Sequence, residues 1–304
     1  MSCQDQKKLI VVLGPTASGK SELAVKLARK FNAEIVSADS RQVYKGIDIG
    51  TGKVTKKERQ GIPHYLLDVA SPKRRFTVAQ YRKLALEAIN KIFEKGKIPI
   101  LCGGTGFYIQ AVIDGITIPE VKPDYLLRSN LNKLETEGLF KKLKKLDPLR
   151  AKTIDKNNRR RLIRALEIVI KTKKPVPTLK KESLPYSVLM IGIKKEKEEL
   201  KKIIKKRFLK WLRQGLIKEI KNLRKSGLSW KKIEEFGIHY RVVARYLENK
   251  INYEKMVENS LKELQNYAKG QMVWFKRDNR ILWTPPTNHP YKYAEKLVKE
   301  FLKK

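Results

Sequence analysis

Short apolar runs alternate with amphipathic stretches over the first third of the chain. Residues 9–13 are apolar throughout and too few for an ordinary helix, so they predict a buried strand. Residues 22–31 repeat Leu and Ala at helical spacing and predict a helix. Two more strand-like runs occupy residues 34–38 and 98–102. Strands alternating with helices predict a parallel sheet with right-handed crossovers and helices on both faces.

The pattern changes at Pro119, where strand-like runs give way to Lys- and Arg-rich helical stretches. Asn158 is placed to cap one of these helices. We therefore expect a helical insertion domain at residues 119–184, and an α/β core formed by residues 1–118 and 185–304. The stripe that the capped helix would bury consists of Leu162, Leu166, Val169 and Ile170.

After the insertion, residues 187–193 again predict a strand that returns to the sheet, and the last third of the chain is helical and basic. A further strand-like run occupies residues 281–283. One helix carries Arg207 on the same face as its apolar residues. This arginine either extends along the apolar surface to reach solvent, or points from the core side toward a phosphate group. The apolar residues of that face are Leu200, Ile203, Ile204, Trp211 and Leu212.

A phosphate-binding loop joins the first predicted strand to the first predicted helix. Its glycines let backbone N–H groups close around phosphate oxygens, while Lys20, the helix N-terminus and a magnesium ion on Ser21 supply positive charge. All fixed positions of the motif are present in a strand–loop–helix context, which makes a chance match in a glycine-rich turn the weaker alternative. A diphosphate or triphosphate is therefore expected at Gly14, Pro15, Thr16, Ala17, Ser18, Gly19, Lys20 and Ser21.

Two other predicted strands are also followed by residues that can carry chemistry. Asp39 could accept a proton or position a metal ion, or it could only cap a helix or form a turn. Residues 103–106 read Gly-Gly-Thr-Gly, which offers close backbone approach and the Thr105 hydroxyl, or simply a tight turn. Ligands bind at the carboxyl ends of parallel strands. If the three strands are neighbours, Asp39, Thr105 and the phosphate-binding loop share one crevice.

The charge of the chain indicates a polyanionic partner. Its 69 Lys and Arg residues against 31 Asp and Glu residues give a net charge of +38, more than solubility requires. Nucleic acid is the leading candidate, and a lysine-rich solvated surface is the alternative.

Cysteine content and hydropathy suggest where the protein works. Cys3 and Cys102 are too few for a disulfide framework or a zinc site, which fits a reducing compartment. Residues 9–13 are too short for a signal peptide core or a membrane span. We expect a soluble cytoplasmic protein that does not bind membranes.

Motifs along nearly the whole chain resemble those of the tRNA dimethylallyltransferase family. Few other proteins combine the segment Asp-Ser-Arg-Gln-Val-Tyr at residues 39–44 with a phosphate-binding loop. The resemblance implies a P-loop NTPase-like core of parallel strands. The matching motifs occupy residues 14–21, 37–44, 48–51, 63–64, 67–68, 103–105 and 161–167.

This resemblance implies transfer of a dimethylallyl group from dimethylallyl diphosphate to the exocyclic N6 amine of an adenosine, with release of diphosphate. The adenosine is the one just 3′ of the anticodon in tRNAs that read U-starting codons. Asp39 would act as general base, and Thr105 would orient the amine and the diphosphate. Lys20, Arg207 and Mg²⁺ held by Ser21 would stabilise the departing diphosphate. The loop would then bind a leaving group instead of ATP.

The resemblance also implies contacts to the tRNA anticodon stem-loop, whose target base must be extruded into the crevice. Gln42 suits the edge of an adenine. We expect the enzyme to act as a monomer. The implied tRNA-binding residues are Asp39, Ser40, Arg41, Gln42, Arg160, Arg161, Arg164, Tyr240, Arg241, Lys269, Gln271 and Trp274.

The chain departs from the family pattern at several positions. His239 stands where a glycine is usual, and Gln265 and Gly270 replace two arginines, which puts phosphate contacts there in doubt. Residues 50–54 lack the usual alanine and proline, so we expect the loop that follows them to be looser.

Two other functions remain open from the residues alone. A small-molecule kinase also combines a phosphate loop with a carboxylate after the second strand, but it would not need so basic a surface. A non-catalytic RNA-binding module that senses a nucleotide is the second alternative.

Overall fold

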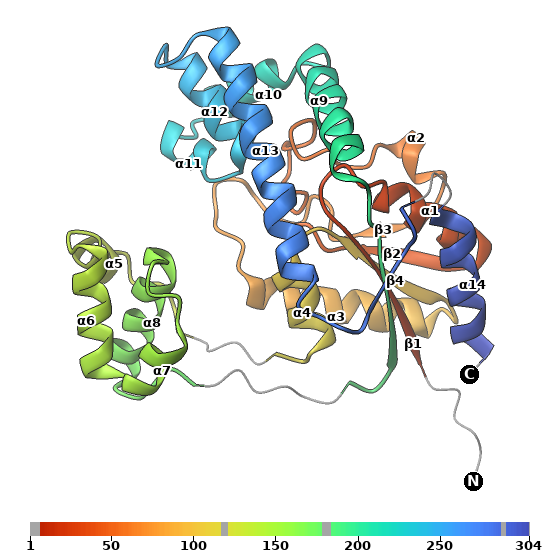
Figure 1. Ribbon diagram of the computed structural model, residues 1–304, viewed down its shortest axis with the longest axis horizontal. Helices are drawn as coiled ribbons and strands as arrows, with labels where there is room; N and C mark the ends of the chain where they lie inside the picture. Colours follow the sequence, from red (N-terminus) through yellow and green to blue (C-terminus); the bar gives the residue numbers. More distant parts are fainter. Residues whose placement is uncertain (1–6, 117–120, 178–183, 287–289, 304) are drawn as a thin grey trace. The chain divides into compact units, whose positions relative to one another are not determined.

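The computed structural model describes residues 7–116, 121–177, 184–286 and 290–303 (Figure 1). The chain divides into two compact units. The first comprises Met1–Asp114 and Ser183–Lys304, and the second comprises Gly115–Glu182. Pro119, at which the sequence pattern placed the boundary, lies outside the described residues, as does Cys3.

A six-stranded sheet forms the centre of the first unit, and all of its described strand pairs are parallel. The predicted parallel α/β architecture is therefore confirmed. The strand order is β3-β2-β4-β1-β5-β6, which makes β2, β4 and β1 consecutive neighbours. The strands are β1 (Lys8–Leu13), β2 (Ala33–Ser37), β3 (His64–Tyr65), β4 (Ile98–Gly103), β5 (Ser187–Gly192) and β6 (Ile281–Trp283).

Both faces of this sheet are covered by helices, as the apolar runs require. Successive side chains of a strand point to opposite faces, so Ile10 and Val12 enter one core and Val11 enters the other. Helices α1 (Lys20–Lys30) and α14 (Pro290–Lys303) pack on the first face. Helices α3 (Val78–Glu94) and α4 (Gly106–Ile113) pack on the second (Figure 1).

The helices after β5 build a layer beside the carboxyl ends of the strands. The longest of them, α13 (Tyr253–Phe275), packs against α4, α9 and α12. It therefore links the sheet to the helices that follow β5. The other members are α9 (Lys197–Arg213), α10 (Leu216–Lys225), α11 (Trp230–Glu234) and α12 (Ile238–Leu247), and a short α2 (Lys56–Arg59) precedes β3.

Sequence patterns had not indicated β3 and α3. The start of α3 nevertheless carries a recognisable signal, because Thr77 and Gln80 form a capping box. The Thr77 hydroxyl accepts a hydrogen bond from the Gln80 N–H at 3.2 Å, and the Gln80 side chain accepts one from the Thr77 N–H at 2.9 Å.

In the second unit, the described elements are helices with a core of their own. Asn158 caps α8 by accepting a hydrogen bond from the Arg161 N–H at 3.2 Å, as predicted. The predicted residues Leu162, Leu166 and Val169 are buried in this helix. The helices are α5 (Tyr125–Leu131), α6 (Thr136–Leu146), α7 (Pro148–Thr153) and α8 (Arg159–Thr172).

Within the described residues of both units, none of the helices combines the length and apolar character needed to cross a membrane.

Candidate active site

A cavity of about 940 Å³ lies where β1, β2 and β4 end. Residues at or after the end of each of these strands line it, including Lys20, Asp39 and Gly103. Helices α9 and α13 complete the wall with Arg207 and Gln271. The strand order thus brings the phosphate loop and Asp39 into one crevice, as the sequence predicted.

The backbone conformation and the close packing of the phosphate loop both require glycine at particular positions. Gly19 adopts a φ of +90°, a conformation that other residues rarely adopt. A Cβ at Gly14 would lie 2.9 Å from the Ser18 hydroxyl oxygen and 3.1 Å from the Ile193 carbonyl oxygen, so the loop is closely packed there. The loop residues that line the cavity are Thr16, Ala17, Gly19, Lys20 and Ser21.

Lys20 begins α1 and donates a hydrogen bond from Nζ to the Pro15 carbonyl at 3.2 Å. Burial lowers the pKa of Lys20, and the nearby positive charge of Arg207 adds to this effect, while the charge of Asp39 opposes it. A bound anion would remove part of this cost by pairing with the ammonium group. The loop is thus suited to a negatively charged ligand.

Asp39 combines a turn-forming role with a position in the cavity wall. Its Oδ1 accepts hydrogen bonds from the backbone N–H groups of Arg41 at 2.8 Å and Gln42 at 3.3 Å. The turn fixes the carboxylate at the tip of β2, so the two interpretations of this residue are compatible.

Thr105 supports Asp39 from the neighbouring strand end. Its N–H donates to the Ala38 carbonyl at 3.1 Å, and its Oγ1 accepts from the Ser40 N–H at 3.0 Å. Among the described residues, the cavity lining includes Gly103 but not Thr105. A direct contact between Thr105 and a substrate remains a prediction.

Arg207 lies in the cavity wall and packs closely on both sides. Its guanidinium stacks 4.6 Å from the centre of the Trp211 ring, and a Cβ added at Gly52 would lie 1.8 Å from Nη2. Burial lowers the pKa of Arg207, and the charge of Asp39 opposes that shift. The guanidinium is thus placed toward the cavity that contains the phosphate loop, and its contact with a diphosphate remains a prediction.

The loop at residues 48–54 is firmly held, and the looser loop that the sequence suggested after residue 54 remains a prediction. The Glu219 carboxylate accepts hydrogen bonds from the N–H groups of Asp48 at 2.9 Å, Ile49 at 2.7 Å and Gly50 at 3.2 Å. It also accepts one from the Tyr240 hydroxyl at 2.6 Å. One side chain from α10 therefore fixes three consecutive backbone N–H groups of this loop.

Lys53 anchors the other end of this loop. Its buried ammonium group donates to the Asp48 carboxylate, to Asp68 Oδ1 at 2.6 Å and to the Tyr44 carbonyl at 2.8 Å. A buried charge with this many acceptors stabilises one loop conformation. Sequence reasoning missed the role of Glu219, because the loop residues that it binds are about 170 positions away. It also missed Lys53, whose partners lie 5 to 15 positions away but follow no regular repeat.

Tyr240, His239 and Gln42, which lie in segments predicted to contact tRNA, also have structural roles within the protein. Tyr240 is fully buried and its hydroxyl is bonded to Glu219, so we correct its assignment as a tRNA contact. His239 is also buried, and burial lowers its pKa to about 3, so the imidazole is neutral at pH 7. Gln42 donates its amide to the carbonyls of Thr51 at 3.3 Å and Gly52 at 3.2 Å, and its reading of a base remains a prediction.

The remaining predicted tRNA contacts differ in exposure. Arg160, Arg161 and Lys269 are exposed. Arg164 and Arg241 are partly exposed and form ion pairs with Glu167 and Glu263. Ser40 and Arg41 are partly exposed near Asp39, whereas Trp274 packs against Gly106, where a Cβ would lie 2.2 Å from its ring.

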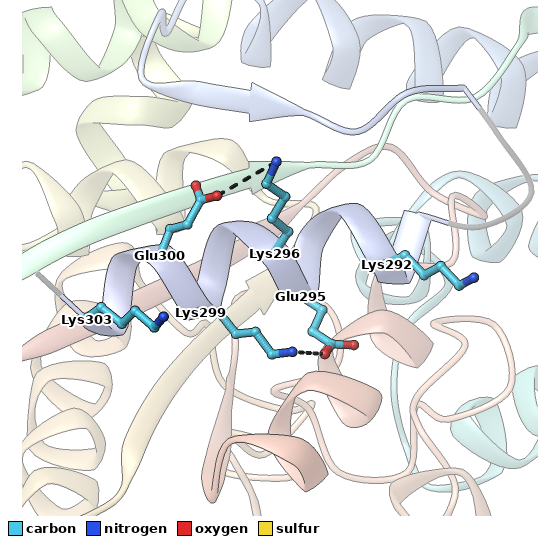
Figure 2. A pocket seen from close by; sticks show the side chains of 6 residues that line it. All are labelled: Lys292, Glu295, Lys296, Lys299, Glu300 and Lys303. Carbon is cyan, nitrogen blue, oxygen red and sulfur yellow. Dashed lines mark ion pairs between the residues drawn. The ribbon is translucent and has the colours of Figure 1, made fainter.

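A second cavity, of about 390 Å³, lies along α14 and is lined only by Lys and Glu side chains (Figure 2). Lys299 pairs with Glu295 at 2.8 Å, and Lys296 approaches Glu300 at 4.0 Å. Exposed i,i+4 pairs of this kind contribute little to stability. This face is an ordinary charged helix surface and offers no catalytic group.

The residues at the main cavity are compatible with a magnesium ion. The described residues include no group of three or more His, Cys, Asp or Glu side chains arranged to hold a metal. Ser21 and Asp39 nevertheless both line the cavity with oxygen atoms. Mg²⁺ typically binds one or two protein oxygens and completes its coordination with water and phosphate oxygens, so this donor set fits.

A parallel α/β sheet with a phosphate loop and a carboxylate at its carboxyl edge defines a P-loop-like enzyme core. The family model described as IPP transferase matches residues 42–278, and the chain belongs to this family. It is 41% identical to a tRNA dimethylallyltransferase of Halothermothrix orenii, over 98% of this chain and 94% of the relative. It is 40% identical to that of Pelotomaculum thermopropionicum, over 93% and 92% of the two chains.

Solved structures agree with this membership. A tRNA isopentenylpyrophosphate transferase from Bacillus halodurans is similar with a TM-score of 0.73 and 34% identity, covering 98% of this chain and 97% of that one. A eukaryotic dimethylallyltransferase described as acting on tRNA has a TM-score of 0.79 and 26% identity, covering 98% of this chain and 80% of that one. The similarity extends over nearly the whole chain, beyond the phosphate loop alone.

Proposed function

We propose that this enzyme transfers a dimethylallyl group from dimethylallyl diphosphate to N6 of the adenosine 3′-adjacent to the anticodon. Its substrates are tRNAs that read U-starting codons, and diphosphate is released. Family membership supports this reaction. The structural observation that carries it is one cavity lined by the cations of Lys20 and Arg207 and by the carboxylate of Asp39. Leaving-group stabilisation and proton removal are the two tasks of this transfer.

The chemistry follows from the charges that develop during transfer. The N6 amine forms a bond to C1 of the dimethylallyl group while the C1–O bond to diphosphate breaks, and the electron pair leaves with diphosphate. Lys20 and Arg207 stabilise this growing negative charge, because fixed cations in a partly buried site need little reorganisation. Asp39 accepts the proton that the amine loses. Water must be kept from the allylic centre during transfer, because it would otherwise capture that centre.

Mg²⁺ is part of this proposal. Ser21 would hold it together with diphosphate oxygens, and it would supply additional positive charge to the leaving group. We assign the proton transfer to Asp39 and the remaining charge stabilisation to Lys20 and Arg207.

The basic surface supports tRNA as the acceptor. The net charge of +38 and the exposed side chains of Arg160, Arg161 and Lys269 suit a polyphosphate backbone. The proposal includes a monomeric enzyme that works in the cytoplasm, where its tRNA substrates are. Because phosphate contacts release counterions, tRNA affinity should fall steeply with salt, whereas a flat response would indicate a merely solvated surface.

A labelling assay tests the proposal. The purified chain with Mg²⁺ and radiolabelled dimethylallyl diphosphate is expected to label an unmodified tRNA in which the adenosine follows an anticodon that ends in A. The matched control is the same tRNA with guanosine in place of that adenosine, and it should remain unlabelled. A failure to label any such tRNA together with phosphate transfer from labelled ATP would instead identify a kinase. Binding of tRNA with neither reaction would indicate the RNA-binding module.

A further inference from the structure

Gln271 connects two loops of the active site that are far apart in sequence. Its Oε1 accepts a hydrogen bond from the backbone N–H of Thr16, in the phosphate loop, at 2.8 Å. Its Nε2 donates to the backbone carbonyl of Gly104, after β4, at 2.7 Å. One carboxamide from α13 thus bridges the segments that follow β1 and β4.

The surroundings of this bridge leave little freedom. Gln271 is only 8% exposed although it lines the cavity. A Cβ at Gly104 would lie 2.5 Å from Gln271 Nε2, and 3.5 Å from both the Gly14 carbonyl oxygen and Lys20 Cε. The backbone at Gly104 is therefore in close contact with Gln271 and the phosphate loop, which any side chain there would disturb.

The bridge continues to the proposed general base. Gly104 is followed by Thr105, whose Oγ1 accepts the Ser40 N–H at 3.0 Å, and Ser40 follows Asp39. Thr16 is therefore linked to Asp39 through three hydrogen bonds and two pairs of adjacent residues. The hydrogen bonds are those of Gln271 to Thr16 and to Gly104, and that of Thr105 to Ser40. The adjacent pairs are Gly104–Thr105 and Asp39–Ser40. The two ends of this linkage are the loop that holds the leaving group and the carboxylate that receives the proton.

We infer that Gln271 is a positioning residue that sets the separation between the phosphate loop and Asp39. This inference rests on the proposed function and replaces the expectation that Gln271 contacts tRNA. Both polar ends of its side chain are bonded within the protein, so the two loops fix the orientation of the carboxamide.

Only a carboxamide of this length satisfies both loops. Glutamate could still accept from the Thr16 N–H, but as a carboxylate it has no donor for the Gly104 carbonyl. It would also add negative charge beside a diphosphate. Methionine keeps the length and the packing while removing both hydrogen bonds. Gln271→Met and Gln271→Glu therefore test the loss of the hydrogen bonds while the size of the side chain is kept.

The test compares Gln271→Met with the matched control Asn266→Ala, which removes an exposed amide from the same helix. Three quantities are measured. They are the Kd of inorganic pyrophosphate with Mg²⁺ by calorimetry, the single-turnover transfer rate at saturating substrates, and the Kd of tRNA at two salt concentrations. Circular dichroism and thermal unfolding show whether each variant is folded.

Gln271→Met is expected to weaken pyrophosphate binding by about tenfold or more, which corresponds to one or two hydrogen bonds, and to slow single-turnover transfer. Its tRNA Kd should stay within about twofold of the wild-type value, and Asn266→Ala should leave all three quantities unchanged. Gln271→Glu should weaken pyrophosphate binding further. If Gln271→Met does not fold, wild-type pyrophosphate affinity and transfer rate in Gln271→Glu would overturn the inference.

The inference is overturned if the pyrophosphate Kd and the transfer rate of folded Gln271→Met match wild type, whether or not tRNA affinity falls. It is also overturned if the wild-type chain does not bind pyrophosphate. A chain that binds pyrophosphate but transfers no prenyl group would contradict the proposed function, and the comparison of pyrophosphate affinities would still decide the role of Gln271.

Discussion

The hydroxyl oxygen of Thr105 accepts a hydrogen bond from the backbone N–H of Ser40 at 3.0 Å. Because Ser40 follows Asp39 directly, this bond ties the end of β4 to the residue that we propose as the general base. The Thr105 N–H adds a second link to β2 through the Ala38 carbonyl at 3.1 Å. The two strand ends that form the site are thus joined at the point where proton transfer would occur.

Replacing Thr105 by Val should slow transfer, because the isosteric side chain leaves the Ser40 N–H without its acceptor and lets Asp39 move. The single-turnover rate should fall about tenfold or more, which corresponds to a hydrogen bond whose loss also disturbs a catalytic position. Thr105→Ser keeps the hydroxyl and should retain most of the rate. Equal rates for Thr105→Val and wild type would show that this bond is dispensable.

Asp39→Asn should separate proton transfer from recognition. Asparagine can still accept the hydrogen bonds from Arg41 and Gln42 through its side-chain oxygen, so the turn should survive. It cannot accept the proton from the amine, and general-base catalysis is typically worth about 10²–10⁴-fold in rate. We expect a loss of transfer in this range, with tRNA affinity nearly unchanged in filter binding. A large loss of tRNA affinity would assign Asp39 to recognition.

The sequence predicted the parts of this enzyme that depend on local patterns. The apolar runs of β1, β2, β4, β5 and β6, the phosphate loop and the Asn158 cap are encoded in consecutive or regularly spaced residues. The parallel order of the strands followed from the alternation of strands and helices. These local features are sufficient to predict that Lys20 and Asp39 share one crevice.

Contacts between distant segments could not be predicted in this way. Glu219 and residues 48–50 are separated by about 170 positions, and no local pattern connects a carboxylate on α10 with three N–H groups of a loop. For the same reason Gln271 was interpreted as a tRNA contact, although it binds two loops inside the protein.

Glu219 is therefore expected to be important for stability as well as activity. Glu219→Ala removes the acceptor of three backbone N–H groups and of the Tyr240 hydroxyl, which should cost about 2 kcal/mol or more of unfolding free energy. It should also weaken binding of Mg²⁺–pyrophosphate, because the loop that supports Arg207 through Gly52 becomes mobile. Denaturant unfolding and calorimetry measure these two effects.

Two matched variants provide reference values for the loss of unfolding free energy expected from Glu219→Ala. Tyr240→Phe removes one of the four hydrogen bonds and should cost about 1 kcal/mol. Glu198→Ala removes an exposed carboxylate that pairs with Lys201 on α9, and it should change stability by less than about 0.5 kcal/mol. If Glu219→Ala were no more destabilising than Glu198→Ala, the contacts of Lys53 and Gln42 would be sufficient to hold the loop.

Glu167 should make the stability of the helical unit depend on pH. This buried carboxylate accepts hydrogen bonds from Arg128 at 2.7 and 2.8 Å, from the Asp124 N–H at 2.7 Å and from Arg164. Burial alone would raise its pKa, but these bonds outweigh that effect and lower the pKa of Glu167 to about 2, from 4.5. A carboxyl group with a lowered pKa in the folded state stabilises that state fully above its ordinary pKa.

This stabilisation is lost as the pH falls from about 4.5 toward about 2. Over this interval the carboxylate becomes protonated, and its charge no longer favours the hydrogen bonds that it accepts. Glu167→Gln has no charge to lose, so the difference in stability between wild type and this variant should be largest near pH 7 and shrink over that interval. Amide hydrogen exchange of α8 as a function of pH measures this difference in stability within the helical unit. Glu137→Gln, which changes an exposed carboxylate on α6 that pairs with Lys141, is the control and should show a much smaller difference from wild type. A Glu167→Gln difference that does not vary with pH would mean that the hydrogen bonds to Arg128 and Arg164 do not depend on the charge of Glu167.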